Sequence, residues 1–176
     1  QGNVEWQRSY GDAQDEIANS IDISNGGGFI ITGEVINANT GFGLCHLMKI
    51  DDEGELSWSN TFGGSQNDNG FSVTSTNDGG FAITGVTRSL GDNDGDAWLI
   101  KVSGSGAIQW ERTYGGEDTE FGRAIQQTVD GGYIIIGQTE SFGVGSSDAY
   151  LLKTDSEGNE MWSQTFGGQG TDQGRD

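Results

Sequence analysis

Short stretches in which apolar and polar residues alternate run through the whole chain, and glycine-rich turns separate them. Residues 71–76 and 81–87 alternate in this way on either side of a turn that contains two glycines. Alternation with a period of two is typical of β-strands with one buried face. No window keeps the i, i+3, i+4, i+7 spacing of an amphipathic helix. The pattern therefore predicts an all-β fold with almost no helix.

The pattern repeats with a period of 52 residues, which four of the five tryptophans mark: Trp6, Trp58, Trp110 and Trp162. The same shift aligns the glycine pair and aromatic of residues 27–29 with those of residues 79–81 and 131–133, without insertion or deletion. Counted from the tryptophans, the units are 6–57, 58–109, 110–161 and a partial unit 162–176. We interpret residues 1–176 as a single tandem-repeat segment.

Each unit holds four predicted strands, as in residues 57–62, 71–76, 81–87 and 97–102 of the second unit. A four-stranded antiparallel sheet repeated every 40–50 residues or so is typical of a β-propeller blade. Such a sheet buries its faces by stacking on neighbouring blades. The expected inter-blade core consists of the tryptophans together with Ile31, Ile83, Ile135, Leu47, Leu99 and Leu151.

The chain holds about three and a third such blades, whereas closed propellers usually have about 4–8. We therefore expect the segment to belong to a larger chain, or to pair with other copies of itself. Its expected partners are therefore other blades of a larger parent chain or other copies of itself.

The unit consensus reads W-x-x-T-[FY]-G-G, then an acid, D-G-G-[FY]-x-I-x-G-x-T-x-S-x-G and D-x-x-L-x-K-x-D-x-x-G-x-x-x-W. It resembles the tandem repeats of secreted β-propeller proteins of Bacteroidetes and some archaea, which often carry a sorting tail for type IX secretion. Residues 153–162 are also similar to the tryptophan-docking motif of PQQ-type propellers, and the glycine pair is more loosely similar to Kelch blades. The resemblance implies an extracellular or cell-surface, propeller-like protein. It implies no reaction, and nothing indicates bound PQQ.

Composition narrows the classes of partner. The chain has 27 acidic and 8 basic residues, a formal charge of −19. Eight basic residues cannot form a phosphate-binding stripe against this excess of negative charge, so we expect no nucleic-acid partner. No apolar run approaches the 20 or so residues of a membrane span, so we expect no membrane insertion. A single cysteine excludes a disulfide framework.

The repeat separates structural residues, which recur in every unit, from residues specific to one unit. His46 takes the place of Trp98 and Tyr150, which indicates an aromatic position, and Cys45 takes the place of alanines. Because neighbours along a strand point to opposite faces, Cys45 and His46 do not form a thiolate–imidazole pair. We nominate no catalytic residue.

One acid recurs at a single repeat position, as Glu16, Asp68, Glu120 and Asp172. These carboxylates could form a ring that collects cations. We favour a structural role, in which each accepts hydrogen bonds from turn amides after the glycine pair.

Asp92, Asp94 and Asp96 form the best metal candidate, a calcium loop with acids at i, i+2 and i+4 and a glycine at position 95. Calcium takes about 6–8 oxygen ligands. The other units lack this run, so the site would be confined to one blade. Alternatively, Asp96 and its counterpart Asp148 start a strand as backbone caps. No other cofactor is predicted.

Three functions remain open. The first is a non-enzymatic extracellular binding or scaffold module, whose loops 88–95 and 140–147 would contact a surface glycan or protein. The second is self-assembly into a closed oligomer or filament through open blade edges. The third is a carbohydrate-active enzyme with paired carboxylates, although no pair is distinguished from the other acids.

Overall fold

The computed structural model describes residues 2–11, 13–91 and 94–175. These residues form twelve strands and contain no helix, so the all-β prediction is confirmed. The strands are β1 (Glu16–Ile23), β2 (Phe29–Ile36), β3 (Gly43–Ile50), β4 (Leu56–Phe62), β5 (Asp68–Ser75), β6 (Phe81–Thr87), β7 (Asp96–Val102), β8 (Ile108–Tyr114), β9 (Glu120–Gln127), β10 (Tyr133–Thr139), β11 (Asp148–Thr154) and β12 (Glu160–Phe166).

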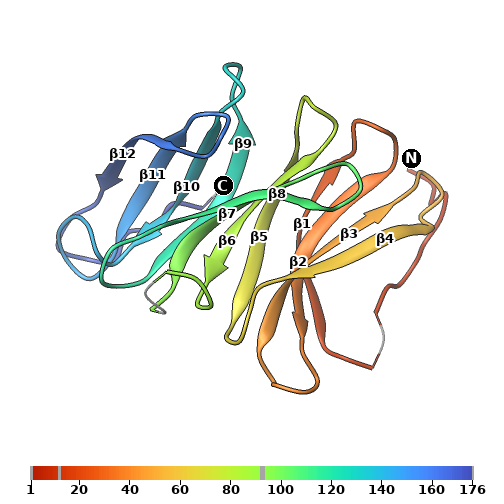
Figure 1. The fold of residues 1–176 in the computed structure, drawn as a ribbon, viewed down its shortest axis with the longest axis horizontal. Helices are drawn as coiled ribbons and strands as arrows, with labels where there is room; N and C mark the ends of the chain where they lie inside the picture. Colours follow the sequence, from red (N-terminus) through yellow and green to blue (C-terminus); the bar gives the residue numbers. More distant parts are fainter. Residues whose placement is uncertain (1, 12, 92–93, 176) are drawn as a thin grey trace.

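The strands form three four-stranded antiparallel sheets, each ordered as in the chain: β1–β4, β5–β8 and β9–β12 (Figure 1). We call them the first, second and third sheets. They do not close into a ring. The last strands of the three sheets, β4, β8 and β12, carry Trp58, Trp110 and Trp162, whereas Trp6 precedes β1. Units counted from the tryptophans therefore begin one strand before the sheets do.

The sheets stack in chain order through their first strands. β5 packs on β1, β2 and β3 of the first sheet, and β9 packs on β5, β6 and β7 of the second. Alternate residues of one strand serve both neighbours: Trp98 belongs to the core between the first and second sheets, and Leu99 to the core between the second and third. β7 thus packs on both neighbouring sheets, which places the second sheet between the first and the third.

Much of the predicted core is buried as expected, including Leu47, Ile83 and Ile135. Ile31 is only half-buried, because it lines the outer face of the first sheet, where no sheet covers it. Leu151, on the third sheet, is half-buried too. Residues at one repeat position therefore lie at the same place in their sheets but differ in burial, because burial depends on whether a neighbouring sheet covers them.

The four repeated tryptophans do not lie inside the core, which corrects the prediction made for them. Trp58 is half-buried at the margin of the junction between two sheets, where its ring centroid lies 6.1 Å from that of Phe81. The tryptophan occupies the last strand of its sheet and reaches a turn of the next, where Gly106 has a φ of +81°. A Cβ there would lie 2.9 Å from the Trp58 ring, so the turn needs glycine both for its backbone and for this contact.

A second recurring glycine lies inside the second strand of each sheet. At Gly85 a Cβ would lie 1.7 Å from the carbonyl oxygen of Asn69 in β5, and Gly33 and Gly137 face the first strands of their sheets in the same way. The register between the first and second strands shifts at this level. The glycine therefore makes room for a bulge that bends the first strand of the sheet.

Candidate functional site

The recurring acids bind the loops of their own sheets. Asp68, fully buried, accepts hydrogen bonds from the Gly64 amide at 2.8 Å, the Thr87 hydroxyl at 2.5 Å and the Ser89 hydroxyl at 2.6 Å. Glu120 is equally buried and accepts the corresponding bonds in the third sheet. Buried carboxylates are stabilised by several such donors. These two acids therefore hold the loop after the glycine pair against the loop after the second strand.

The two end members of this acid series lie in more open surroundings. Asp172 is exposed and accepts a hydrogen bond from the Gly168 amide at 2.9 Å. The Glu16 carboxylate lies against Gly11, where a Cβ would be 2.8 Å from its Oε2. The turn contact thus recurs at the ends of the chain, although fewer loops surround it there.

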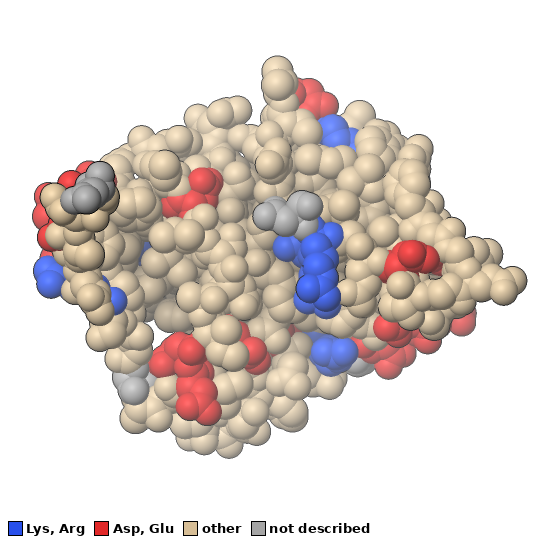
Figure 2. Space-filling view, turned by 180° about the vertical axis from the view of Figure 1, so that it is seen from behind, with Lys and Arg blue, Asp and Glu red and all other residues tan. Residues whose placement is uncertain are grey.

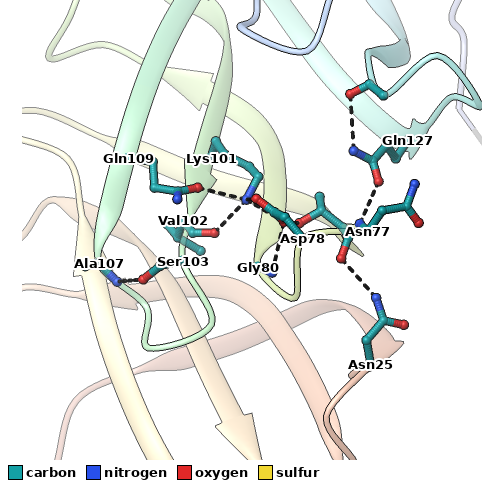
Figure 3. A network of polar contacts seen from close by, with 12 residues as sticks. Asn25, Asn77, Asp78, Gly80, Lys101, Val102, Ser103, Ala107, Gln109 and Gln127 are labelled. Carbon is teal, nitrogen blue, oxygen red and sulfur yellow. Dashed lines mark hydrogen bonds and ion pairs between the residues drawn. The ribbon is translucent and has the colours of Figure 1, made fainter.

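The recurring lysines form a second structural set, of which Figure 3 shows Lys101. Lys101 is buried, and its ammonium lies 2.9 Å from Asp78 and donates to Gln109 at 2.9 Å. Partial burial disfavours the charged form of Asp78, but hydrogen bonds from Thr76, Lys101 and the Gly80 amide outweigh it and lower its pKa to about 2. Lys153 pairs with its own turn aspartate at 3.0 Å in the third sheet. These pairs hold the hairpin turns.

The same turn region connects the three sheets. Asn25 of the first sheet donates to the carbonyl of Thr76 at 3.0 Å, and the Asn77 amide donates to the Gln127 side chain of the third sheet at 2.9 Å (Figure 3). The second sheet is thereby tied to both neighbours by polar contacts as well as by apolar packing.

Cys45 and His46 lie on opposite faces of β3 (Gly43–Ile50). Cys45 is buried between the first and second sheets, and burial raises the pKa of its thiol to about 12. His46 lines the outer face of the first sheet, and partial burial lowers the pKa of its imidazole. Since the sheet separates the two groups, they cannot exchange a proton directly.

The calcium hypothesis concerns one residue, Asp92, that lies outside the described residues. Asp96 is buried at the start of β7, and its carboxylate fills the space beside Gly91, where a Cβ would be 1.6 Å from its Oδ2. Its counterpart Asp148 accepts a hydrogen bond from the Val144 amide at 2.6 Å. Within the described ranges no three His, Cys, Asp or Glu side chains gather as a metal site. Calcium binding by Asp92, Asp94 and Asp96 therefore stays a prediction.

The chemistry-bearing residues that sequence reasoning missed lie along the first strands of the sheets. A hollow of about 350 Å³ opens there, and we call it the inner-strand hollow. Its lining residues are Asn19, Ser20, Phe71, Ser72, Arg123, Ala124 and Arg175. Four of them occupy one repeat position, which reads Asn, Phe, Arg and Arg along the chain. The sequence did contain an indication of this hollow, namely one repeat position whose residue type varies within an otherwise recurring unit.

Arg123 is held in this hollow by two aromatic rings. Its guanidinium carbon lies 4.6 Å from the ring centroids of both Phe71 and Phe121. Burial and, after it, the positive charge of Arg175 lower the pKa of Arg123. The ion pairs found within residues 2–11, 13–91 and 94–175 involve neither arginine. Figure 2 shows a column of basic side chains near the middle of one face, with acidic groups set apart from it.

The two terminal segments of the chain repeat contacts that are also found between its sheets. In the N-terminal segment, the Tyr10 hydroxyl donates to the carbonyl of Gly54 at 2.8 Å, as Tyr114 donates to Gly158 at 2.5 Å. This segment thus lies on the first sheet as β8 lies on the third. It partly covers a hollow of about 750 Å³ on the outer face of the first sheet, which His46 helps to line.

At the C-terminal end, residues 171–175 lie against the third sheet. The Asp172 amide donates to Ser147 at 2.8 Å, and the Gly174 amide donates to Gly137 at 2.9 Å. This segment therefore follows the path on which the first strand of a further sheet would begin.

Comparison with known proteins gives no family. No family model matches the chain, and no curated protein matches it. The solved structures that are similar include a protein of unknown function from Bacteroides caccae, at 13% identity and a TM-score of 0.30, with 98% of this chain and 91% of that chain covered. In the described residues no helix has the length and hydropathy to cross a membrane.

Proposed function

We propose that this chain is a non-enzymatic binding or scaffold module of the extracellular space or cell surface, whose stacked sheets are blades of a β-propeller. The observation that carries the binding function is the inner-strand hollow. The repeat keeps the residues that build each sheet, but the position that lines the hollow changes from Asn19 to Phe71 and then to arginine in the last two units. Small-molecule sites are typically concave and hold a few convergent polar groups on a rigid frame.

The contrast between recurring polar residues, which hold loops and turns, and the variable residues of the hollow supports a binding function. The recurring acids Asp68 and Glu120 bind loop donors, and the recurring Lys101 binds a turn acid. The position shared by Asn19 and Arg123 is one whose chemistry the sheets do not dictate, because asparagine and arginine occupy the same place on equivalent strands. Residues that vary on a constant scaffold are suited to contact a ligand.

The propeller and the location both rest on the blade consensus, which resembles that of secreted propellers. The propeller is further supported by the antiparallel four-stranded sheets, which stack through their first strands as blades do. The net charge of −19 favours solubility.

A glycan array tests the binding function. The immobilised protein is expected to retain a defined set of saccharides, and Ala124→Phe, which fills the hollow, is expected to abolish that retention. Ala107→Phe, on an exposed turn, serves as the matched control and is expected to bind as the parent does. If no saccharide is retained, or if Ala124→Phe binds normally while folded, the hollow is not the site.

A second candidate function, self-assembly, is favoured by the contrast between the ends and the interior of the stack. Ile21 in β1 is 61% exposed, whereas Val73 and Ile125, at the same repeat position, are 4% and 5% exposed. The first sheet therefore presents to solvent the face that the other two sheets bury.

The opposite end shows the same contrast. Phe166 in β12 is 53% exposed, whereas Phe62 and Tyr114, at the same repeat position, are 7% and 8% exposed. The two end faces are complementary, because inside the chain such faces pack on each other. A heterologous contact between copies would join them head to tail.

Light scattering after size exclusion tests assembly. The parent chain is expected to form particles larger than the 18.6 kDa monomer. Both Ile21→Asp and Phe166→Asp are expected to return it to a monomer. Val129→Asp, on a fully exposed turn, is the control that adds the same charge elsewhere. A parent chain that is monomeric at high concentration removes this candidate.

A further inference from the structure

We propose that the inner-strand hollow binds an anionic group, a carboxylate or a sulfate, carried by a small hydroxyl-bearing molecule such as an acidic sugar. Arg123 and Arg175 hold the anion, and Asn19, Ser20 and Ser72 contact its hydroxyls. This inference rests on the proposed binding function and names its ligand class.

The first argument is the placement of charge. The chain carries only eight Lys and Arg against 27 Asp and Glu, yet two arginines at one repeat position line the same hollow. They are close enough for Arg175 to disfavour the charged form of Arg123. Two cations held together repel each other, and an anion between them relieves that repulsion. The hollow is thus a local positive site on an acidic protein.

The second argument is the preorganisation of Arg123. Phe71 and Phe121 each lie 4.6 Å from its guanidinium carbon and hold the group by cation–π contact. Its Nη2 reaches Gln138 Oε1 only at 3.5 Å, a long hydrogen bond. Among the described residues the guanidinium makes no other hydrogen bond, so its remaining edge N–H groups can meet a ligand. A planar guanidinium fixed in this way matches two oxygens of one carboxylate or sulfate.

The third argument concerns the neutral residues of the hollow. The Ser20 hydroxyl oxygen accepts a hydrogen bond from the Val73 amide at 3.3 Å, and the Ser72 hydroxyl oxygen accepts one from the Ile125 amide at 3.4 Å. Each serine keeps its own hydroxyl proton to donate. The Asn19 amide nitrogen donates to Gly70 at 2.8 Å, which leaves its carbonyl oxygen as an acceptor. These donors and acceptors suit the hydroxyls of a sugar.

The size of the hollow limits the ligand. A volume of about 350 Å³ lies near the lower end of small-molecule sites, which span roughly 300–1,000 Å³. It admits a single sugar unit with its charged group, or the end unit of a longer chain.

Isothermal titration with three probes tests the proposal: sodium glucuronate, glucose 6-sulfate and glucose. At least one of the two charged sugars is expected to bind more than tenfold more tightly than glucose, and the stronger one identifies the anion as carboxylate or sulfate. Added sodium chloride is expected to weaken this binding, since it screens the arginines.

Variants assign the binding to the two arginines. Arg123→Gln and Arg175→Gln are each expected to lower the affinity at least tenfold. Arg175 lies in an exposed segment, so its replacement keeps the test valid even if Arg123→Gln fails to fold. The matched control is Arg112→Gln, which removes an arginine that also lies over an aromatic ring, at 5.7 Å from the Trp110 centroid, but outside the hollow.

Equal binding of all three probes overturns the inference, as does binding of a charged sugar that Arg175→Gln leaves unchanged. Failure of both charged sugars to bind overturns it too. The proposed binding function has its own test, because neutral saccharides retained on the array and lost in Ala124→Phe would support that function without an anion site.

Discussion

The Trp58 indole lies at the junction of the first and second sheets, with its ring centroid 6.1 Å from that of Phe81. The same contact recurs between Trp110 and Tyr133 at 5.9 Å, where the second sheet meets the third. Trp6 repeats it on Phe29 at 6.3 Å. Each of the two junctions between sheets is therefore closed at its margin by one tryptophan from the last strand of a sheet and one aromatic of the next.

Two members of the tryptophan series, the inner Trp110 and the last Trp162, are expected to contribute differently to stability. Trp110→Ala is expected to lower the free energy of unfolding by about 2–3 kcal/mol, because a half-buried indole loses its contact with the third sheet. Trp162→Ala is expected to cost less than about 1 kcal/mol, since Trp162 is 41% exposed on the last strand. Urea denaturation measures both. Equal losses would contradict the role of the tryptophan at the junction.

Asp68 and Asp172 share a repeat position and allow a second comparison of a buried residue with an exposed one. Asp68→Ala leaves the buried Thr87 hydroxyl and loop amides without an acceptor, so a loss of about 3 kcal/mol is expected. Asp172→Ala removes one exposed contact and is expected to cost under about 1 kcal/mol. Thermal melts and amide exchange of residues 87–89 give the comparison. A small effect at Asp68 would mean that its loop holds without it.

The Lys101–Asp78 pair predicts a pH dependence. The pKa of Asp78 falls from 3.8 to about 2 on folding, so its contribution to stability is complete above about pH 4 and is lost as the pH falls through 2. The difference in unfolding free energy between the parent and Asp78→Asn is therefore expected to shrink between pH 5 and pH 2. Chemical denaturation across that range measures it, and a constant difference would be the contrary result.

The calcium hypothesis has its own measurement. If Asp92, Asp94 and Asp96 bind calcium, millimolar calcium is expected to raise the melting temperature of the parent and to leave Asp94→Asn unchanged. Asp94 is the informative position, because the Asp96 carboxylate already fills the space beside Gly91. Magnesium at the same concentration controls for screening of the net charge of −19. A melting temperature that calcium does not move removes the hypothesis.

Much of the fold could be predicted because the repeat is exact in length. The alternation in residues 81–87 and the glycine pair before it specify a strand and its turn wherever they recur, and the structure has that strand in every sheet. Burial could not be predicted in the same way. Ile31 and Ile83 occupy the same repeat position, but only Ile83 faces a neighbouring sheet, whereas Ile31 lines the outer face of the first sheet.

The candidate site was missed for a related reason. Recurrence draws attention to residues such as Asp68 and Lys101, which hold turns and loops. Arg123 and Arg175 were two scattered cations in the sequence. Only the stacking of the first strands brings their shared repeat position to one hollow.

The contact of each tryptophan with the turn glycine of the next sheet has an evolutionary consequence. Because every junction uses the same pair, as Trp58 with Gly106 and Trp110 with Gly158, a gene that gains or loses one complete unit by recombination keeps all its junctions intact. Such a lineage can change the number of modules without redesigning any of them. A single codon change at the repeat position of Arg123 then suffices to change a side chain that lines the inner-strand hollow.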